Sequence, residues 1–374
     1  MTPAPRRLVL NARFLTQAQS GVQRYAHMLM TAFDRLLEHP SLAQRLGPVT
    51  AYYPADAGLQ VTPAWRHITL EPLPCRWPGG GHIWEQTALA RAARGGYLLN
   101  LTGSGPALHR DQLLVIHDAN IWHVPDAFSR RYRGFHKTLR PVLARRARDL
   151  ATVSQFSAQE LAQVLDQPEL RFRVIPNGAD HLVPPRDCAA VMSALGLSKN
   201  GFFLAVGNLS PNKNLVRLAQ AMAKLGYPLP LVIAGAEASG LAKAGLPPEL
   251  AHSGQVRFLG RVDDDTLAVL YANARAFLWP PLREGFGIPP LEAMRFGIPV
   301  LSSNSTAMPE VLAQAPIYFE PQDVEDIARA IAQFLALPTE ARDAQVIAGY
   351  DRARRFSWDR SAKQLAELLT KRLS

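Results

Sequence analysis

Short apolar runs alternate with longer amphipathic segments along the chain, and this alternation constrains the fold more than any other feature of the sequence. The apolar runs are nearly continuous, which is typical of β-strands buried on both faces. In the first half of the chain they occupy residues 8–15, 96–102, 113–118, 149–154 and 172–178. Segments between them, including 127–147 and 157–165, have helical periodicity. Repeated strand–helix units predict a mostly parallel sheet covered by helices.

The same alternation begins again in the second half. Apolar runs occupy residues 202–208, 229–235, 256–260, 275–280 and 298–303, and amphipathic helices are expected at 215–225 and 361–373. A chain of 374 residues is long for one core. We therefore expect an α/β protein of two doubly wound, Rossmann-like domains that face each other across a cleft. The predicted divisions are residues 1–170, residues 171–355, and a last helix at 356–374 that packs back on the first domain.

Composition narrows the class of protein. Apolar residues make up 48% and charged residues 19%, as in ordinary globular proteins. No apolar run approaches the roughly 18 residues of a membrane-spanning helix, and the apolar run near the N-terminus reads as a strand rather than a signal peptide. Cys75 and Cys188 are far apart and have no metal-ligand spacing. We expect free thiols, a cytoplasmic location and no catalytic metal.

The net charge of +10 is concentrated in the first half. Residues 1–190 carry 22 Lys and Arg against 14 Asp and Glu, whereas residues 191–374 carry 19 against 17. Such asymmetry predicts an anionic partner.

Residues 129–148, SRRYRGFHKTLRPVLARRAR, hold eight of these basic residues and no acid. The apolar residues there share one helical face, and most charges fall opposite, with a kink expected at Pro141. The apolar face comprises Phe128, Tyr132, Phe135, Leu139, Val142 and Leu143. A solvated helix face is the ordinary meaning of such a run. Binding to anionic lipid headgroups, with peripheral association at the inner face of a membrane, is the second interpretation.

The segment LWPPLREGFGIPPLEAM, residues 278–294, contains two glutamates with seven residues between them. Glu284 is expected on the loop that follows a strand. Glu292 is expected in the first turn of a helix that the Pro289–Pro290 pair begins. Free backbone N–H groups at a helix start after a glycine loop suit an anion. Two glutamates beside an anion suit hydroxyl groups attached to it, which predicts a nucleotide sugar. Alternatively, Glu292 only complements the helix N-terminus.

At this point the sequence resembles a known family. EGFGIPPLEAM followed by GIPVLSSNSTAMPE resembles the E-x7-E region of retaining glycosyltransferases of the GT-B fold, family 4 or group 1, in a form similar to mannosyltransferases. Four further stretches match in the right order, so the resemblance covers most of the chain. They are TVSQFSAQEL (152–161), VIPNGAD (174–180), VGNLSPNKNL (206–215) and the segment 256–281.

The resemblance implies roles for the residues around the two glutamates. Glu292 would hold the ribose hydroxyls of the donor, and Glu284 would lie near the transferred sugar. The donor site would also include Val262, from the segment around the nucleobase, and the loop residues Gly285, Phe286, Gly287 and Ile288.

The resemblance also implies a diphosphate site that contains Gly207, Asn208 and Lys213. A lysine there can offset the charge that grows on a leaving diphosphate. The family usually has an arginine at the position of Asn208, and this chain does not, so Asn212, Asn214 and Arg283 are possible partial substitutes. A solvated loop lysine is the alternative for Lys213.

Two residues of the first half complete the predicted site. His117 ends a strand, and the matching histidine of the family contacts the sugar near its anomeric centre. Alternatively, His117 is satisfied within the core or pairs with Asp118. Gly21 matches a flexible loop after the first strand, where a missing Cβ lets the backbone approach a phosphate or sugar. A plain turn glycine is the alternative.

The resemblance implies a metal-independent, retaining glycosyltransferase without a cofactor. It would move a sugar, with mannose as the first candidate, from a GDP- or UDP-sugar substrate to a glycan or lipid-linked acceptor in surface polysaccharide synthesis. A retaining glycosidase would also need two carboxylates. A non-catalytic nucleotide-sugar- or nucleic-acid-binding protein is a third class that the basic first half favours, although no nucleic-acid-binding motif occurs and no specific nucleic acid is expected.

Overall fold

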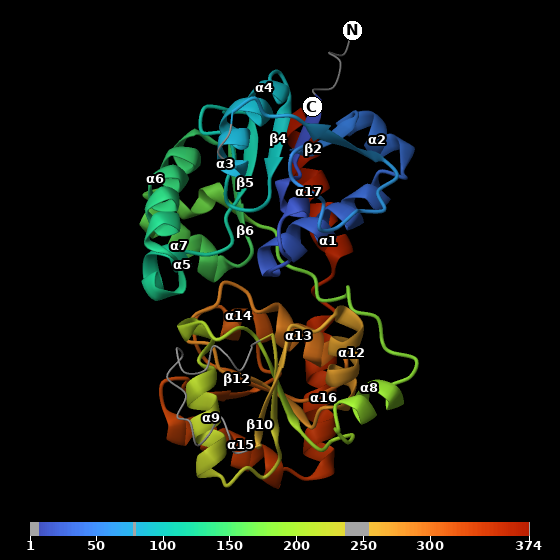
Figure 1. Cartoon of the computed structure of the whole chain (residues 1–374), viewed down its shortest axis with the longest axis vertical. Helices are drawn as coiled ribbons and strands as arrows, with labels where there is room; N and C mark the ends of the chain where they lie inside the picture. Colours follow the sequence, from blue (N-terminus) through green and yellow to red (C-terminus); the bar gives the residue numbers. More distant parts are fainter. Residues whose placement is uncertain (1–6, 78–79, 236–253, 374) are drawn as a thin grey trace. The chain divides into compact units, whose positions relative to one another are not determined.

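The structure is a computed structural model that describes residues 7–77, 80–235 and 254–373. The chain divides into two compact units (Figure 1). Unit 1 comprises Met1–Gly178 and Ser357–Ser374, and unit 2 comprises Ala179–Phe356. Each unit is built around one parallel sheet.

Unit 1 contains a seven-stranded sheet in the order β3-β2-β1-β4-β5-β6-β7. All neighbouring strands are parallel, and Leu10 of β1 lies between Ala51 of β2 and Leu99 of β4. The strands are β1 (Leu8–Asn11), β2 (Val49–Pro54), β3 (Ile68–Leu73), β4 (Tyr97–Asn100), β5 (Gln112–Val115), β6 (Asp149–Thr152) and β7 (Phe172–Val174).

Helices cover this sheet, and serine side chains begin three of them. Ser20, Ser129 and Ser154 accept hydrogen bonds from backbone N–H groups in the first turns of α1, α6 and α7. The longer helices are α1 (Gly21–Leu36), α2 (Pro40–Leu46), α6 (Arg130–Arg146), α7 (Gln155–Leu165) and α17 (Trp358–Leu373). Shorter elements are η1 (Arg13–Thr16), α3 (Gly81–Trp84), the π-helix η2 (Glu85–Leu89), α4 (Ala90–Ala92), α5 (Asn120–His123), η3 (Pro125–Ala127) and η4 (Glu169–Arg171).

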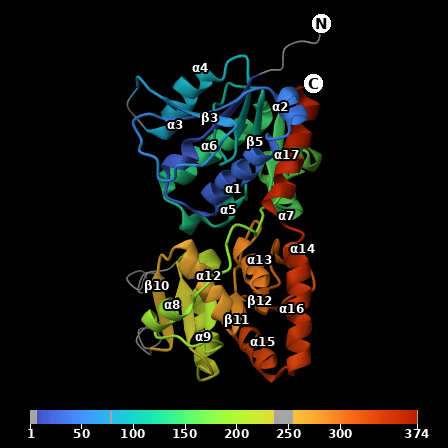
Figure 2. The ribbon, with the colours of Figure 1, turned by 90° about the vertical axis from the view of Figure 1, so that its right-hand side faces the viewer.

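The last helix belongs to unit 1 although it ends the chain. Figure 2 shows α17 beside α1, and the two helices pack together. Tyr25 of α1 connects this helix to α17 and to the segment after β7. Its ring contacts Trp358 with centroids 6.0 Å apart, and its hydroxyl donates to the Ile175 carbonyl at 3.2 Å.

Unit 2 contains a six-stranded parallel sheet in the order β10-β9-β8-β11-β12-β13. The strands are β8 (Phe203–Val206), β9 (Leu231–Ala234), β10 (Val256–Gly260), β11 (Ala276–Trp279), β12 (Val300–Ser303) and β13 (Ile317–Phe319). The helices are α8 (Ala189–Ala194), η5 (Pro211–Lys213), α9 (Leu215–Lys224), α12 (Asp264–Asn273), α13 (Ile288–Arg295), α14 (Met308–Leu312), α15 (Val324–Ala336) and α16 (Thr339–Ala353). Apolar residues of α9 and α15 form one core with β8, β9, β11 and β12.

The predicted fold class is confirmed, since both sheets have the strand order of doubly wound folds. The first predicted division differs by eight residues, because β7 pairs with β6 and residues 171–178 therefore belong to unit 1. The sequence patterns missed β2, β3 and β13. β3 lies at the edge of its sheet and only one of its residues, Ile68, is buried, so it lacks a continuous apolar run. Within the described ranges, no helix is long and apolar enough to cross a membrane.

The basic helix α6 is buried along a different stripe from the predicted one. Its buried residues are His136, Arg140, Leu143 and Ala144, whereas Tyr132, Phe135 and Val142 are 41%, 41% and 37% exposed. The predicted apolar face is thus only partly buried, since Leu143 is buried but these three members are exposed. The buried positions follow helical spacing and turn toward the core that α6 forms with β5, β6 and α7.

Candidate active site

Two predicted residues of unit 2, Lys213 and Glu284, form an ion pair between Nζ and Oε1. Lys213 ends η5 after β8, and Glu284 follows β11, the neighbour of β8 in the sheet. The lysine Nζ lies 4.8 Å from the ring centre of Trp279, and the Glu284 N–H donates to Thr306 Oγ1 at 3.1 Å. The two side chains are 22% and 14% exposed. Lys213 is therefore partly buried and fixed by its ion pair at the carboxyl edge of the sheet, rather than being a solvated loop lysine.

Glu292 is buried and has two partners that the sequence analysis missed. Its Oε2 accepts from the Tyr271 hydroxyl at 2.8 Å, and its Oε1 lies 3.0 Å from His181 Nε2. The residue is 4% exposed. The first turn of α13 contains no acid, so the predicted first-turn position is wrong, and Glu292 lies beyond the turn where a helix N-terminus acts most strongly. His181 directly follows VIPNGAD, which was the only sequence signal near it.

The glycine loop before α13 is closely packed. Gly287 has a φ of +84°, and a Cβ there would lie 2.8 Å from Met308 Cε. Both the backbone conformation and the available space therefore require glycine. Gly285 and Phe286 are buried, and Phe286 contacts the Phe356 ring edge-to-face at 5.4 Å. Ile288 begins the helix.

The asparagines near the predicted diphosphate site have structural partners. Asn214 Nδ2 donates to the carbonyls of Pro280 and Pro321, at 3.0 Å and 2.7 Å. Asn212 Nδ2 donates to the Arg283 carbonyl at 3.3 Å. These amides hold the loops together, which disfavours them as substitutes for a missing arginine.

Asn208, Gly207 and Val262 all follow strands of the same sheet. Asn208 is exposed, and its Oδ1 accepts from the Ser210 hydroxyl at 2.7 Å. The Gly207 N–H donates to the Ala234 carbonyl at 2.9 Å at the end of β8. Val262 is half-buried in the loop between β10 and α12.

In unit 1, His117 follows β5 and packs edge-to-face on Tyr25 at 4.7 Å. Its Nε2 lies 2.9 Å from the Leu101 carbonyl, so Nε2 carries the proton. Burial holds the pKa of His117 below its ordinary value, despite that hydrogen bond and the nearby Asp118 carboxylate. The imidazole is thus neutral, with Nδ1 as an acceptor. Asp118 Oδ1 accepts from the Asn120 N–H at 2.9 Å.

Gly21 is the first residue of α1 rather than part of a loop. It is exposed, and a Cβ built on it meets nothing within 4 Å. No local contact therefore requires a glycine at this position.

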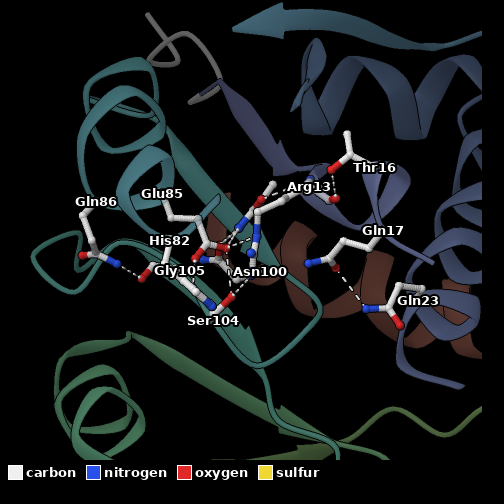
Figure 3. A network of polar contacts seen from close by, with 11 residues as sticks. Arg13, Thr16, Gln17, Gln23, His82, Glu85, Gln86, Asn100, Ser104 and Gly105 are labelled. Atoms are coloured by element: carbon white, nitrogen blue, oxygen red, sulfur yellow. Dashed lines mark hydrogen bonds and ion pairs between the residues drawn. The ribbon is translucent and has the colours of Figure 1, made fainter. Parts of the chain in front are cut away.

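A buried carboxylate network in unit 1 escaped the sequence analysis (Figure 3). Glu85 Oε1 accepts from Asn11 Nδ2 at 2.9 Å, Arg13 Nε at 3.1 Å and Ser104 Oγ at 2.9 Å, and Oε2 lies 3.1 Å from His82 Nδ1. Burial alone would raise the pKa of Glu85, but the hydrogen bond from His82 and the charge of Arg13 hold it below its ordinary value. These residues are far apart in sequence, so no local motif predicts the network.

The Glu85 network fixes Arg13 at the carboxyl end of β1. Glu85 lies on a π-helix, an irregularity that is common at functional sites. Arg13 and His82 line a cavity of about 300 Å³ together with Thr102, His117, Asp118 and Tyr132. Within the described parts of the chain, no group of three or more His, Cys, Asp or Glu could hold a metal ion.

Comparison with known proteins identifies the chemistry of this fold. Residues 192–352 match the family model "Glycosyl transferases group 1". The chain is also 34% identical over 261 residues to the O-antigen chain mannosyltransferase B of Escherichia coli, an alignment that covers 67% of this chain and 68% of that protein. The chain belongs to the glycosyl transferases group 1 family.

This group 1 glycosyltransferase is similar to further proteins. It is 30% identical over 245 residues to the serotype-specific mannosyltransferase WbdA of Escherichia coli, where the match covers 58% of this chain and 28% of the longer relative. It shares its fold with the sucrose-phosphate synthase of Thermosynechococcus elongatus, with a TM-score of 0.75, 20% identity and 98% coverage of both chains. The GT-B fold is thereby confirmed. Family membership favours a glycosyltransferase over the glycosidase and the non-catalytic binding protein.

Proposed function

We propose that this glycosyltransferase transfers mannose, with retention of anomeric configuration, from a GDP- or UDP-linked donor to a glycan or lipid-linked acceptor of a surface polysaccharide. The observation that carries the proposal is the Lys213–Glu284 pair at the carboxyl edge of the second sheet, because it joins VGNLSPNKNL to the E-x7-E segment, which also holds Glu292. The mannosyltransferase names of the relatives support the choice of sugar and pathway class. In this proposal unit 2 binds the donor and unit 1 binds the acceptor.

The proposed reaction is a front-face displacement. The acceptor oxygen forms a bond to the anomeric carbon on the face from which the nucleoside diphosphate departs. The electron pair of the broken C–O bond goes to the leaving phosphate oxygen, and that phosphate takes the proton of the acceptor hydroxyl. Negative charge therefore grows on the diphosphate and positive charge on the sugar, and the protein contributes positioning and charge stabilisation.

Lys213 would offset the diphosphate charge, and Glu284 would lie near the sugar ring. Glu292 would accept from the ribose hydroxyls. A carboxylate has about four lone-pair sites, so the hydrogen bond from Tyr271 and the contact with His181 leave acceptor capacity for a ligand. His117 would offer its neutral imidazole to the sugar near the anomeric centre.

The remaining predicted donor residues would form the walls of the site. The backbone of Gly207 and Asn208 would face the diphosphate, and Val262 would face the nucleobase. Ile288 and the packed loop Gly285–Phe286–Gly287 would present backbone N–H groups. Gly21 would allow the start of α1 to approach the donor.

Release of a nucleoside diphosphate tests this function. GDP-mannose, UDP-glucose and other nucleotide sugars are incubated one at a time with the protein, and the free nucleoside diphosphate is measured. We expect release from GDP-mannose above all, and donors that bind to raise the melting temperature, since a ligand at 100 times its Kd adds about 2.7 kcal/mol of stability. Absence of release from every nucleotide sugar, with cleavage of nitrophenyl glycosides instead, would show a glycosidase.

We also propose that exposed residues of α6 meet an anionic membrane surface. Arg130, Arg131 and Lys137 are exposed, and the exposed ring of Phe135 lies on the same helix. Basic residues attract acidic headgroups, and aromatic rings suit the interface between headgroups and lipid tails. A lipid-linked acceptor would then be met at the surface that carries it.

Reversing the three charges of α6 to glutamate should abolish sedimentation with phosphatidylserine vesicles. Each basic residue near such a surface contributes roughly 1 kcal/mol, so the loss should exceed about a hundredfold in partitioning. The matched control reverses three exposed cations elsewhere, Lys199, Arg354 and Lys363. Activity on a soluble acceptor analogue should survive in both variants. Equal sedimentation of the α6 variant and the wild type would refute the membrane role.

A further inference from the structure

Two buried side chains of α6, His136 and Arg140, have nitrogen atoms without hydrogen-bond partners among the described residues. His136 is 2% exposed and Arg140 is 8% exposed. Among the described residues, neither ring nitrogen of His136 has a hydrogen-bond partner, and the same holds for Nε and Nη1 of Arg140. A buried charge without a partner destabilises a fold unless a ligand completes it. These donors therefore indicate a group that the protein itself does not supply.

Both residues line the 300 Å³ cavity at the carboxyl ends of β1, β4 and β5. Gly103, on the loop after β4, has a φ of +72°, and a Cβ there would lie 3.1 Å from Arg140 Nη2. Glycine thus leaves room beside the guanidinium. The cavity lies wholly within unit 1.

The charges around the cavity leave Arg140 as its least compensated cation. Arg13 also lines the cavity, but the buried Glu85 carboxylate pairs with it at 3.1 Å. Asp118 lies near enough to oppose the lowering of the Arg140 pKa that burial causes, yet it forms no ion pair with Arg140 among the described residues. Burial, followed by the charges of Arg140 and His82, lowers the pKa of His136 to about 3. The imidazole is therefore neutral and offers one donor and one acceptor.

An aromatic wall adjoins these groups. The rings of Phe128 and Tyr132 stack at 5.6 Å with planes 10° apart, and Tyr132 contacts His136 at 4.2 Å. Phe128 and Tyr132 both line the cavity. A flat apolar surface next to polar groups suits a sugar ring that carries a polar substituent.

We propose that this cavity binds an acidic group on the acceptor, a phosphate or a carboxylate, through Arg140, with the adjoining sugar ring against Phe128 and Tyr132. Guanidinium N–H groups match two oxygens of such an anion at once. That the ligand is the acceptor rests on the proposed function. That the cavity takes an anionic sugar rests on the buried groups of α6 and on the aromatic wall beside them.

The test is calorimetric binding of three probes to the full chain: glucose 1-phosphate, glucuronate and neutral methyl glucoside. We expect an anionic probe to bind at least about tenfold more tightly than methyl glucoside. Arg140→Met should weaken anionic binding roughly ten- to a hundredfold, as loss of a charged hydrogen bond does. Arg66→Met, at an exposed arginine of the same unit, should bind like the wild type, and so should Lys213→Ala, which excludes binding at the donor site. Preference for glucose 1-phosphate or for glucuronate identifies the anion.

Thermal unfolding supplies a second readout, because a purely structural role of Arg140 would predict a lower melting temperature for its variants. Because methionine removes a buried, unpaired charge, Arg140→Met should keep or raise the melting temperature, by roughly 2–4 °C. If this variant does not fold, Arg140→Lys replaces it. Lysine keeps the charge but lacks the planar guanidinium, so this variant should bind the anion several-fold more weakly than the wild type.

Equal binding of anionic and neutral probes, or wild-type binding by the Arg140 variants, would overturn the site. Anion binding and donor turnover are separate measurements, so the failure of one proposal can be distinguished from the failure of the other. Arg140-dependent binding without release of any nucleoside diphosphate would reject the glycosyl-transfer proposal and keep the site. Release of a nucleoside diphosphate without anion binding would reject the anion site and keep the glycosyl-transfer proposal.

Discussion

Lys213→Ala is expected to lower donor turnover by roughly a hundred- to a thousandfold, the loss typical of removing one group that stabilises a growing negative charge. The ion pair with Glu284 holds the lysine at the carboxyl edge of the sheet, with its Nζ 4.8 Å from the Trp279 ring centre. Its effect should fall on kcat more than on KM, because the diphosphate gains charge as the C–O bond breaks. Steady-state release of nucleoside diphosphate measures both constants, after circular dichroism has confirmed folding.

Unit 2 contains a matched control for this variant. Lys224 also forms an ion pair, with Glu325, but those side chains are 52% and 65% exposed and lie on α9 and α15. Lys224→Ala removes one lysine and one ion pair from the same unit and should leave turnover unchanged. Lys213→Arg should retain part of the activity because it keeps the charge. Wild-type kcat in folded Lys213→Ala protein would reject the assignment.

Glu284→Gln and Glu292→Gln are expected to change different kinetic constants. Glu292 is proposed to hold ribose hydroxyls, which do not change during the reaction. Its loss removes binding that the ground and transition states share, so Glu292→Gln should mainly raise the donor KM. Glu284 is proposed to lie near the sugar, where positive charge develops, so Glu284→Gln should mainly lower kcat. Each lost charged hydrogen bond is worth roughly 1.5–3 kcal/mol, or about ten- to a hundredfold.

Steady-state kinetics of both variants with one donor make this comparison. Glu292 is buried, but glutamine has nearly the same volume and its amide oxygen can still accept from the Tyr271 hydroxyl. Thermal unfolding separates any loss of stability from a change in KM. Glu340→Gln, at an exposed position of unit 2, is the control. Reversal of the KM and kcat effects would show that the two glutamates do not divide the donor in this way.

The sequence predicted the parts of the fold whose signals are local and strong. Strands such as β8 and β11 are buried on both faces, so their apolar runs are continuous and easily recognised. The loop residues Lys213 and Glu284 stand in compact motifs, and each follows such a strand. The edge strand β3 gave no signal because only one of its residues, Ile68, is buried.

The missed residues depend on contacts between distant parts of the chain. Glu85 meets Asn11 and Ser104 only because β1, β4 and η2 come together in the folded unit. His181 reaches Glu292 across more than a hundred residues of sequence. The burial of Arg140 could not be predicted, because charge patterning treats a basic run as a solvated helix face and does not show which of its members is buried.

The ion pair between Lys213 and Glu284 also bears on which anions can occupy the donor site. Cells contain abundant small anions, such as inorganic phosphate, that would fill an open cationic site. Because Glu284 already neutralises Lys213, a small anion must displace a carboxylate and gains few other contacts in return. A nucleotide sugar brings a base, a ribose and a sugar whose additional contacts can offset that displacement. In the proposed donor site, the paired glutamate would therefore act as an internal competitor that favours a large, multiply anchored donor over simple salts.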